Sequence, residues 1–176
     1  FYNSYNLTLS AESILKLDGI GKVEKVYVSE NLTNGFIDVN ENTTIQTFSQ
    51  TKSSRIDIAG GKSLTLTDTF EVPADQTMEF YGSGGGTINI GDNLTLSGIL
   101  QFSAPNYSLK NGILVLNDGS LLDVDYHTII DSDIVLLGNT TVDVAQGVSL
   151  EYRGDAFDLL NYQLTFLGSG TFLNTN

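Results

Sequence analysis

The sequence predicts an all-β protein, and more specifically a right-handed parallel β-helix (β-solenoid) with coils of about 20 residues. Two observations support this prediction. Short runs that alternate polar and apolar side chains recur along the chain, as they do in half-buried strands. Between residues 87 and 148 these runs start about seven residues apart, so that three of them make one coil. Stacked coils would join their inward side chains into one apolar column.

The stretch Gly84–Phe102 shows the pattern most clearly. It contains three short runs, each too short for an ordinary helix, separated by residues that tolerate positive φ or bond to their own backbone. The chain can therefore turn sharply between the runs. The runs are Thr87–Ile90, Leu94–Leu96 and Ile99–Phe102, and the separators are Gly91-Asp92-Asn93 and Ser97-Gly98.

The same spacing continues to the C-terminus, which makes residues 87–176 the more regular part and residues 1–86 the less regular part. Later runs are Ile113–Leu116, Leu121–Val124, Thr128–Ile130, Ile134–Leu137, Thr141–Val144 and Val148–Tyr152. Earlier ones are Leu7–Leu9, Val26–Val28, Phe36–Val39, Ile45–Phe48, Ile56–Ile58, Leu64–Leu66 and Phe70–Val72. Candidate helix caps at Ser10 and Asp155 predict short helices over Ala11–Leu17 and Ala156–Leu160.

A β-sandwich or jelly roll is the alternative fold, because it also has many short alternating strands separated by turns. Its strands usually recur every 8–12 residues or so, which is wider than the spacing here. In either case we expect a single all-β domain over residues 1–176. The chain starts at Phe1 and its only methionine is Met78, so we expect a processed product or an excerpt of a longer chain.

Charge and composition exclude several classes of protein. The chain has 21 acidic and 8 basic residues and a formal net charge of −13, which argues against a nucleic-acid partner. It has no cysteine, so there is neither a disulfide scaffold nor a thiol nucleophile. No apolar run approaches the ~20 residues of a transmembrane helix.

One acidic cluster is a candidate catalytic site. Asp123, Asp125, Asp131 and Asp133 flank His127, the only histidine. Paired carboxylates could serve as acid and base in a polysaccharide-active enzyme, either a glycosidase or a lyase. The alternative interpretation is a set of solvated aspartates at strand ends beside a surface histidine. A structural Ca²⁺ ion is a further option, although no EF-hand loop is present.

Two further features concern recognition at a cell surface. Arg153-Gly154-Asp155 matches a tripeptide that some adhesion receptors bind, although three residues match by chance often. Six candidate N-glycosylation sites occur, at Asn6, Asn31, Asn42, Asn93, Asn106 and Asn139. A chain rich in Asn and Thr also produces such triplets by chance.

A carbohydrate-binding module would need exposed aromatic platforms. The candidate residues for such a platform are scattered along the chain: Tyr2, Tyr5, Tyr107, Tyr126 and Tyr152.

The stretches GGGTINIGDNLTLSGILQF, NGILVLNDGSLLDV and FLGSGTFLN give residues 84–176 a texture that resembles passenger regions of bacterial autotransporter and haemagglutinin-type surface proteins. The resemblance implies a right-handed parallel β-helix outside the cell that serves in adhesion or as a scaffold. It rests on texture and not on a diagnostic motif, so it assigns no site residues.

We therefore expect a secreted or cell-surface structural or adhesive protein without catalytic activity or a required cofactor. It would assemble with copies of itself through strand edges or terminal coils into a fibre, a lattice or a long adhesin. Host or environmental glycans are further candidate partners. The alternatives are the polysaccharide-active enzyme and the carbohydrate-binding module.

Overall fold

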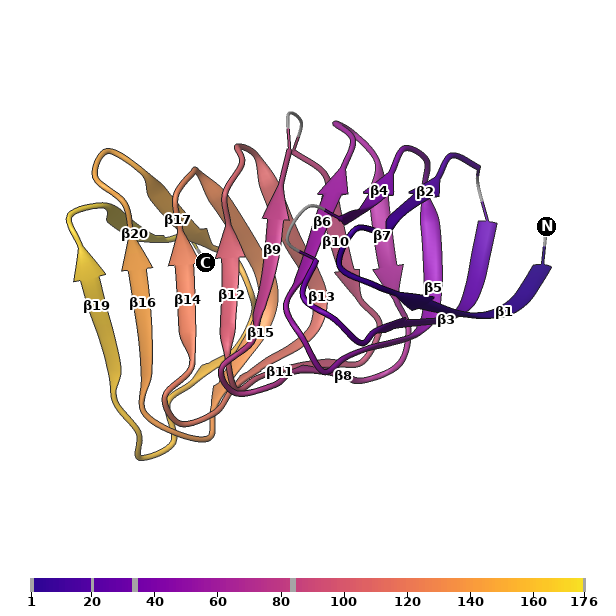
Figure 1. Ribbon diagram of the computed structural model, residues 1–176. Helices are drawn as coiled ribbons and strands as arrows, with labels where there is room; N and C mark the ends of the chain where they lie inside the picture. The colour runs from indigo at the N-terminus through magenta and orange to yellow at the C-terminus, as the bar shows by residue number, and fades with distance from the viewer. Residues whose placement is uncertain (1, 20, 33–34, 83–84, 176) are drawn as a thin grey trace.

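The computed structural model describes residues 2–19, 21–32, 35–82 and 85–175, with side chains from residue 7 onward. Within these residues there is no helix, and every paired strand runs parallel to its neighbour. The strands stack in about seven coils of about 22 residues, with the first and last strands at opposite ends (Figure 1). The predicted parallel β-solenoid is confirmed. The β-sandwich alternative is wrong, because sandwiches are built from antiparallel strands.

The described strands form two sheets. The twelve-stranded sheet contains β1 (Tyr2–Leu9), β3 (Gly21–Val28), β5 (Thr43–Gln50), β7 (Ser63–Leu66), β8 (Phe70–Val72), β10 (Thr87–Ile90), β11 (Asn93–Leu96), β13 (Tyr107–Leu116), β15 (Thr128–Leu136), β17 (Ser149–Tyr152), β18 (Phe157–Asp158) and β20 (Thr171–Asn174). The eight-stranded sheet contains β2 (Ile14–Leu17), β4 (Phe36–Val39), β6 (Ser54–Ile58), β9 (Thr77–Tyr81), β12 (Ile99–Phe102), β14 (Leu121–Val124), β16 (Thr140–Val144) and β19 (Leu164–Gly168).

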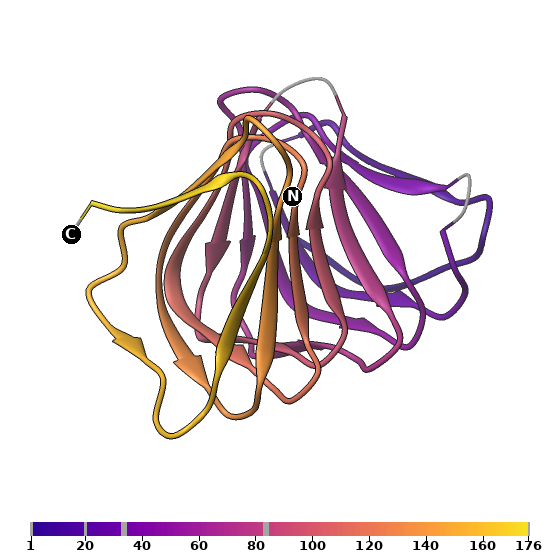
Figure 2. The same cartoon turned by 90° about the vertical axis from the view of Figure 1, so that its left-hand side faces the viewer.

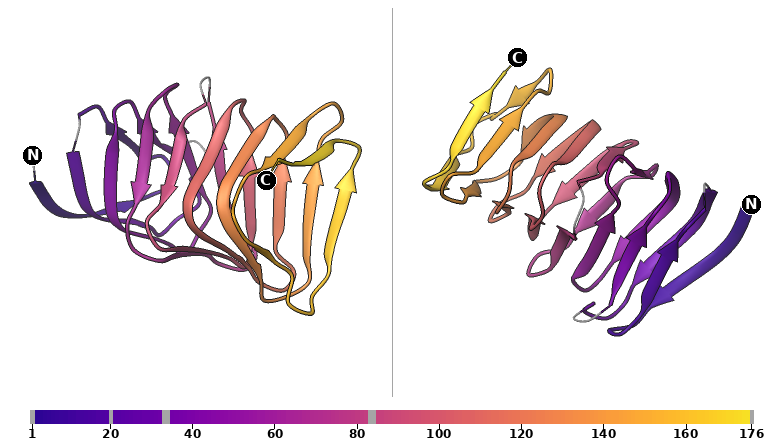
Figure 3. Two further views of the ribbon diagram at one scale, coloured as in Figure 1. Left: turned by 180° about the vertical axis from the view of Figure 1, so that it is seen from behind. Right: turned by 90° about the horizontal axis from the view of Figure 1, so that it is seen from above.

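Residues paired between neighbouring coils lie 19 to 24 positions apart in the sequence, close to the predicted 20. Viewed from the C-terminal end, the coils lie one behind another (Figure 2). The stacking continues across residue 86, since β7 pairs with β10. The less regular and the more regular parts of the sequence are therefore joined in one stack, which the views from behind and above also show (Figure 3).

Some neighbouring runs merge into one strand that bends at a corner of the coil. In β13 the register shifts between Lys110 and Ile113, and Gly112 at this corner has a φ of +52°. That left-handed conformation favours glycine. The twelve-stranded sheet therefore covers two sides of the coil, and the eight-stranded sheet covers the third.

Both predicted helices are wrong. Ile14–Leu17 is strand β2, which pairs with β4, and Phe157–Asp158 is strand β18, which pairs with β15. Each segment is short, and an isolated helical turn is unstable by itself. Pairing with the neighbouring coil satisfies the same backbone groups, and at Leu160 a φ of +48° also excludes a helix.

The core is a set of columns that run through the coils. One column stacks Met78, Leu100, Leu122 and Val142, all of them buried. The alternation that was read from the sequence places each of these side chains inward and its neighbours outward. Burying apolar surface in this way contributes roughly 25 cal/mol for each Å² removed from water.

Aromatic residues fill the middle of the core. The rings of Phe80 and Phe102 stack with centroids 5.5 Å apart, and the ring of Tyr107 packs against both. The Tyr107 hydroxyl donates to the carbonyl oxygen of Tyr81 at 2.7 Å and accepts from the backbone N–H of Ile58 at 3.0 Å. Tyr107 therefore ties together backbone groups of three different coils.

Side chains at turns also join successive coils. The Asp118 carboxylate accepts from the backbone N–H of Asn139 at 2.9 Å, and the Asn139 side-chain oxygen accepts from the backbone N–H of Gln163 at 3.0 Å. Asn and Asp are favoured in turns because their short side chains can bond to nearby backbone. Here the Asp118 and Asn139 side chains bond to the backbone of the adjacent coil.

Candidate functional site

The predicted acidic cluster is divided between the two sheets. Asp123 lies in β14 of the eight-stranded sheet and Asp125 directly follows that strand, whereas Asp131 and Asp133 lie in β15 of the twelve-stranded sheet. The chain turns between them at Tyr126 and His127. The sequence neighbours therefore contribute to different sides of the coil, and they do not form one constellation of four carboxylates.

On the eight-stranded sheet, Asp123 belongs to an outward column of polar side chains. It is in register with Gln101 on one side and Asp143 on the other. Burial, together with the negative charges of Asp125 and Asp143, raises the pKa of Asp123. Gln101 compensates part of this charge, because its amide donates to the Asp125 carboxylate at 3.2 Å. The arrangement disfavours the ionised form of Asp123.

Replacing Asp123 by asparagine is expected to stabilise the protein at neutral pH by about 0.2–1 kcal/mol, the size of a repulsion between like charges across neighbouring strands. Because the folded-state pKa of Asp123 lies above its unfolded value of about 3.9, its penalty is absent below the unfolded pKa and complete above the folded pKa. The gain from Asp123→Asn should therefore shrink as the pH falls toward 4. Urea unfolding at several pH values measures this difference.

The matched control is Asp75→Asn, because Asp75 is an exposed turn residue with a φ of +60°, a conformation that asparagine also adopts. This substitution should leave the free energy of unfolding within about 0.5 kcal/mol of the parent. A loss of stability in Asp123→Asn at pH 7 would contradict the electrostatic interpretation.

The outward face of the same sheet carries further charges toward the N-terminal coils. Arg55 forms an ion pair with Glu79 at 2.8 Å, and its guanidinium lies 4.2 Å from the centre of the Tyr81 ring. Burial and the nearby Asp38 raise the pKa of Asp57. This face therefore carries acidic side chains beside the Arg55–Glu79 ion pair, and no motif in the sequence indicates that pair.

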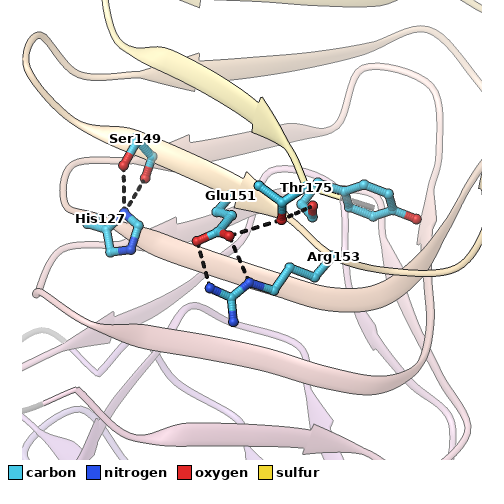
Figure 4. Close-up of polar contacts among 6 residues, drawn as sticks. His127, Ser149, Glu151, Arg153 and Thr175 are labelled. Carbon is cyan, nitrogen blue, oxygen red and sulfur yellow. Dashed lines mark hydrogen bonds and ion pairs between the residues drawn. The ribbon is translucent and has the colours of Figure 1, made fainter.

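A shallow cleft of about 280 Å³ runs along a corner of the twelve-stranded sheet. It brings Asp131 and Asp133 together with the Arg153-Gly154-Asp155 triplet, although these two groups lie about 20 residues apart in the sequence. The Arg153 guanidinium donates to both oxygens of Glu151, at 2.8 and 2.9 Å (Figure 4). These hydrogen bonds, with one from Thr175 at 2.9 Å, lower the pKa of Glu151. The arginine of the triplet is thus held by its own chain.

His127 contacts Ser149, which is not one of the four aspartates of the predicted cluster. Its Nδ1 atom lies 2.6 Å from the Ser149 hydroxyl oxygen and 3.2 Å from the Ser149 carbonyl oxygen (Figure 4). The contact joins the turn before β15 to the start of β17 in the next coil. Residues 22 positions apart meet here because that is about the length of one coil. The coil period is the one sequence signal that could have found this contact.

The candidate glycosylation residues mostly lie on the surface. Asn31, Asn42, Asn106 and Asn139 are exposed and Asn93 is half-buried, while the side chain of Asn6 lies outside the described residues. In Asn31, Asn42 and Asn139 the side-chain oxygen accepts a hydrogen bond from the backbone of the next coil. Those bonds do not use the amide nitrogen to which a glycan is attached.

Three of the five candidate tyrosines for a carbohydrate platform have described side chains, and one of these three is exposed. Tyr107 and Tyr152 are buried, whereas Tyr126 is 46% exposed. The side chains of Tyr2 and Tyr5 lie outside the described residues.

Among the described residues, no three His, Cys, Asp or Glu side chains gather in a group that could hold a metal ion.

Exposed apolar side chains gather on the last coil. Of nine exposed large hydrophobic residues in the described part of the chain, six lie there, and we call them the terminal surface: Leu159, Leu160, Tyr162, Phe166, Leu167 and Leu173. Phe166 sits directly over Val142 in an inward column, yet it is 48% exposed whereas Val142 is 3% exposed. Its ring packs on Phe172 with centroids 5.0 Å apart. The core columns thus reach the surface at this end.

Comparison of the chain with protein-family models, with curated proteins and with solved structures finds no match. The class of the protein therefore rests on its own geometry, which is that of a parallel β-solenoid. Within the described residues, no helix has the length and apolar character needed to cross a membrane.

Proposed function

We propose that this chain is a secreted or cell-surface structural protein that assembles with copies of itself through its terminal coils. The observation that supports the proposal is the terminal surface. Exposed apolar side chains that gather at one end of a protein favour an interaction there, because their exposure to water is unfavourable. The divided acidic cluster makes a single four-carboxylate catalytic centre a poorer account of the same structure.

Strand edges supply the second part of the mechanism. Within the described residues, β19 and β20 each pair with a neighbour on one side only. An edge strand presents a row of backbone N–H and C=O groups that can extend a sheet into another molecule. Apolar burial would then provide affinity, and the backbone hydrogen bonds would fix the register of the contact. A fibre, a lattice or a long adhesin would each result from repeating such a contact.

An extracellular location agrees with the surface chemistry. Four of the six candidate glycosylation residues are exposed, and the charged outer faces would keep such an assembly hydrated. The resemblance to bacterial surface proteins points the same way. In this role glycans of a host or of the environment would be contacted along the sides of the solenoid, with its ends reserved for assembly.

Electron microscopy and sedimentation velocity of the purified chain test this proposal. We expect elongated particles whose mass rises with protein concentration in steps of one 19.0 kDa chain. A single monomeric species at every concentration, and discrete unassembled particles in the micrographs, would reject self-assembly.

The second candidate is a polysaccharide-active enzyme, because the corner cleft holds Asp131 and Asp133 beside Arg153. Two carboxylates and a cation in a cleft are groups that acid–base cleavage of a glycosidic bond requires. The test is release of sugar ends from acidic and neutral polysaccharides. If cleavage occurs, the double variant Asp131→Asn and Asp133→Asn should abolish it while assembly remains.

A further inference from the structure

A groove of about 420 Å³ lies on the outer side of the solenoid, across strands β6, β9 and β12. These strands follow one another in the eight-stranded sheet, and at least two further strands separate them from each of its edges (Figure 1). The groove is therefore a feature of the side of the solenoid and does not involve its terminal coils.

One row of polar side chains in the groove takes one residue from each of these three strands. Arg55, Glu79 and Gln101 are paired in register and face outward. Their positions are fixed by the Arg55–Glu79 ion pair, by the contact of Arg55 with the Tyr81 ring and by the bond from Gln101 to Asp125. Among the described residues, these contacts leave Oε1 of Glu79 and Oε1 of Gln101 as acceptors for a ligand. Side chains that are fixed before binding lose less conformational entropy when a ligand arrives.

A second group of polar side chains lies beside this row. Thr77 begins β9 and faces outward, and its backbone N–H donates to the Ser53 hydroxyl oxygen at 3.0 Å. The Asn31 side-chain oxygen accepts from the backbone N–H of Ser53 at 3.1 Å. These bonds use neither the hydroxyl group of Thr77 nor the amide nitrogen of Asn31. Both groups can donate hydrogen bonds, so the groove offers donors as well as acceptors.

The chemistry of the groove fits a ligand with many hydroxyl groups. A hydroxyl group both donates and accepts, so it matches a surface that contains both kinds of partner. Arg55 and Glu79 are the charged residues among the described residues that line the groove, and they neutralise one another. Leu32 is the apolar lining residue and is 2% exposed, so it offers little surface to a lipid.

The repeat of the coils suits an extended glycan. Neighbouring strands lie about 4.8 Å apart, close to the advance of one sugar unit along an extended polysaccharide. A glycan that runs along the solenoid axis would place successive sugar units over Arg55, Glu79 and Gln101. The formal net charge of −13 repels acidic polysaccharides, so a neutral glycan is favoured.

We infer that this groove binds a neutral, extended glycan whose hydroxyl groups bond to Glu79, Gln101 and Thr77. The inference rests on the proposed function, in which glycans are contacted along the sides of the solenoid. It specifies the place of that contact and the class of the glycan. Binding here leaves both ends of the solenoid available for assembly.

Isothermal titration calorimetry of the full-length chain tests the inference, with neutral hexasaccharides of glucose, mannose and N-acetylglucosamine as probes. The chain is produced in bacteria, so that Asn31 carries no attached glycan. We expect at least one hexasaccharide to bind at millimolar concentration or below. Thr77→Val removes a hydroxyl group that bonds to no described residue, and Gln101→Ala removes an acceptor of the first row. Each variant should weaken binding about fivefold, the contribution of one hydrogen bond.

The matched control is Gln146→Ala, at an exposed turn outside the groove, and it should leave the affinity unchanged. Absence of binding for all three hexasaccharides would overturn the inference. Equal affinities of the parent and both groove variants would also overturn it, because the glycan would then bind elsewhere. Tighter binding of an acidic hexasaccharide of galacturonic acid would contradict the class of the ligand.

Sedimentation velocity of the same samples measures assembly separately from glycan binding. Chains that assemble but bind no hexasaccharide would retain the proposed self-assembly and reject the groove as a glycan site. Monomeric chains that bind a hexasaccharide in the groove would reject self-assembly and retain the glycan site. The two proposals can therefore fail independently.

Discussion

Replacing Tyr107 by alanine is expected to lower the free energy of unfolding by about 4–6 kcal/mol. Removing a large buried aromatic side chain costs about 3–5 kcal/mol through lost apolar contact and the cavity left behind. Here the ring is fully buried between Phe80 and Phe102, so water cannot easily replace it. The hydroxyl adds a further cost, since Ile58 and Tyr81 would lose their hydrogen-bond partner inside the protein. Urea unfolding followed by circular dichroism measures the total.

Tyr107→Phe separates the contribution of the hydroxyl from that of the ring, and it remains informative if the alanine variant does not fold. It should cost about 1–3 kcal/mol, the penalty for leaving a buried backbone donor unsatisfied. Burial raises the pKa of Tyr107, so the hydroxyl keeps the proton that it donates to Tyr81. The control is Tyr126→Phe, on an exposed side chain, and should change stability by less than about 0.5 kcal/mol. Equal effects of the two phenylalanine variants would contradict the bridging role.

The sequence predicted the fold through its periodicity, which is a local property. The runs Phe36–Val39, Phe70–Val72 and Leu121–Val124 coincide with strands β4, β8 and β14. Alternation of side chains is dictated by strand geometry, and the spacing of the runs is dictated by the length of the coil. Both leave a trace in every coil, so the architecture could be read without knowing any contact.

Contacts between coils could not be read in the same way. Coil length varies by several residues, and an error of one residue in register turns a side chain to the other face. The sequence therefore placed Asp123 and Asp131 in one cluster, although they lie on different sheets. It also left unseen the contact of His127 with Ser149 and that of Arg55 with Glu79. The sequence predicts a helix over Ala11–Leu17, because only the pairing of Ile14–Leu17 with β4 identifies that segment as strand β2.

Gly98 shows the same limit, because its turn was predicted but the physical reason for glycine was not. The sequence suggested a residue that tolerates positive φ, yet Gly98 is absent from the positive-φ glycines of the structure. Instead, a Cβ atom at this position would lie 2.2 Å from the carbonyl oxygen of Gln76 and 2.3 Å from that of Pro73. The neighbouring coil leaves room only for a hydrogen atom.

Gly98→Ala is accordingly expected to lower the free energy of unfolding by about 3 kcal/mol, at the upper end of the range for overpacking. Backbone atoms cannot move aside like a flexible side chain. Relief of the clash must therefore displace the coil and lengthen the bonds that Gly98 and Ile99 donate to it, now 3.1 and 2.8 Å. Urea unfolding measures the loss, and hydrogen exchange should show weaker protection in β9 and β12 than in β16.

The matched control is Gly19→Ala, because a Cβ atom at Gly19 would meet no atom within 4 Å and its φ lies outside the left-handed region. Alanine restricts the unfolded chain more than glycine does, so this variant should be as stable as the parent or more stable by about 0.4–1 kcal/mol. The two substitutions change the unfolded chain equally, and their difference isolates the clash between coils. If Gly98→Ala were as stable as Gly19→Ala, the coils would be free to move apart locally. The close stacking of coils at this corner would then contribute little to stability.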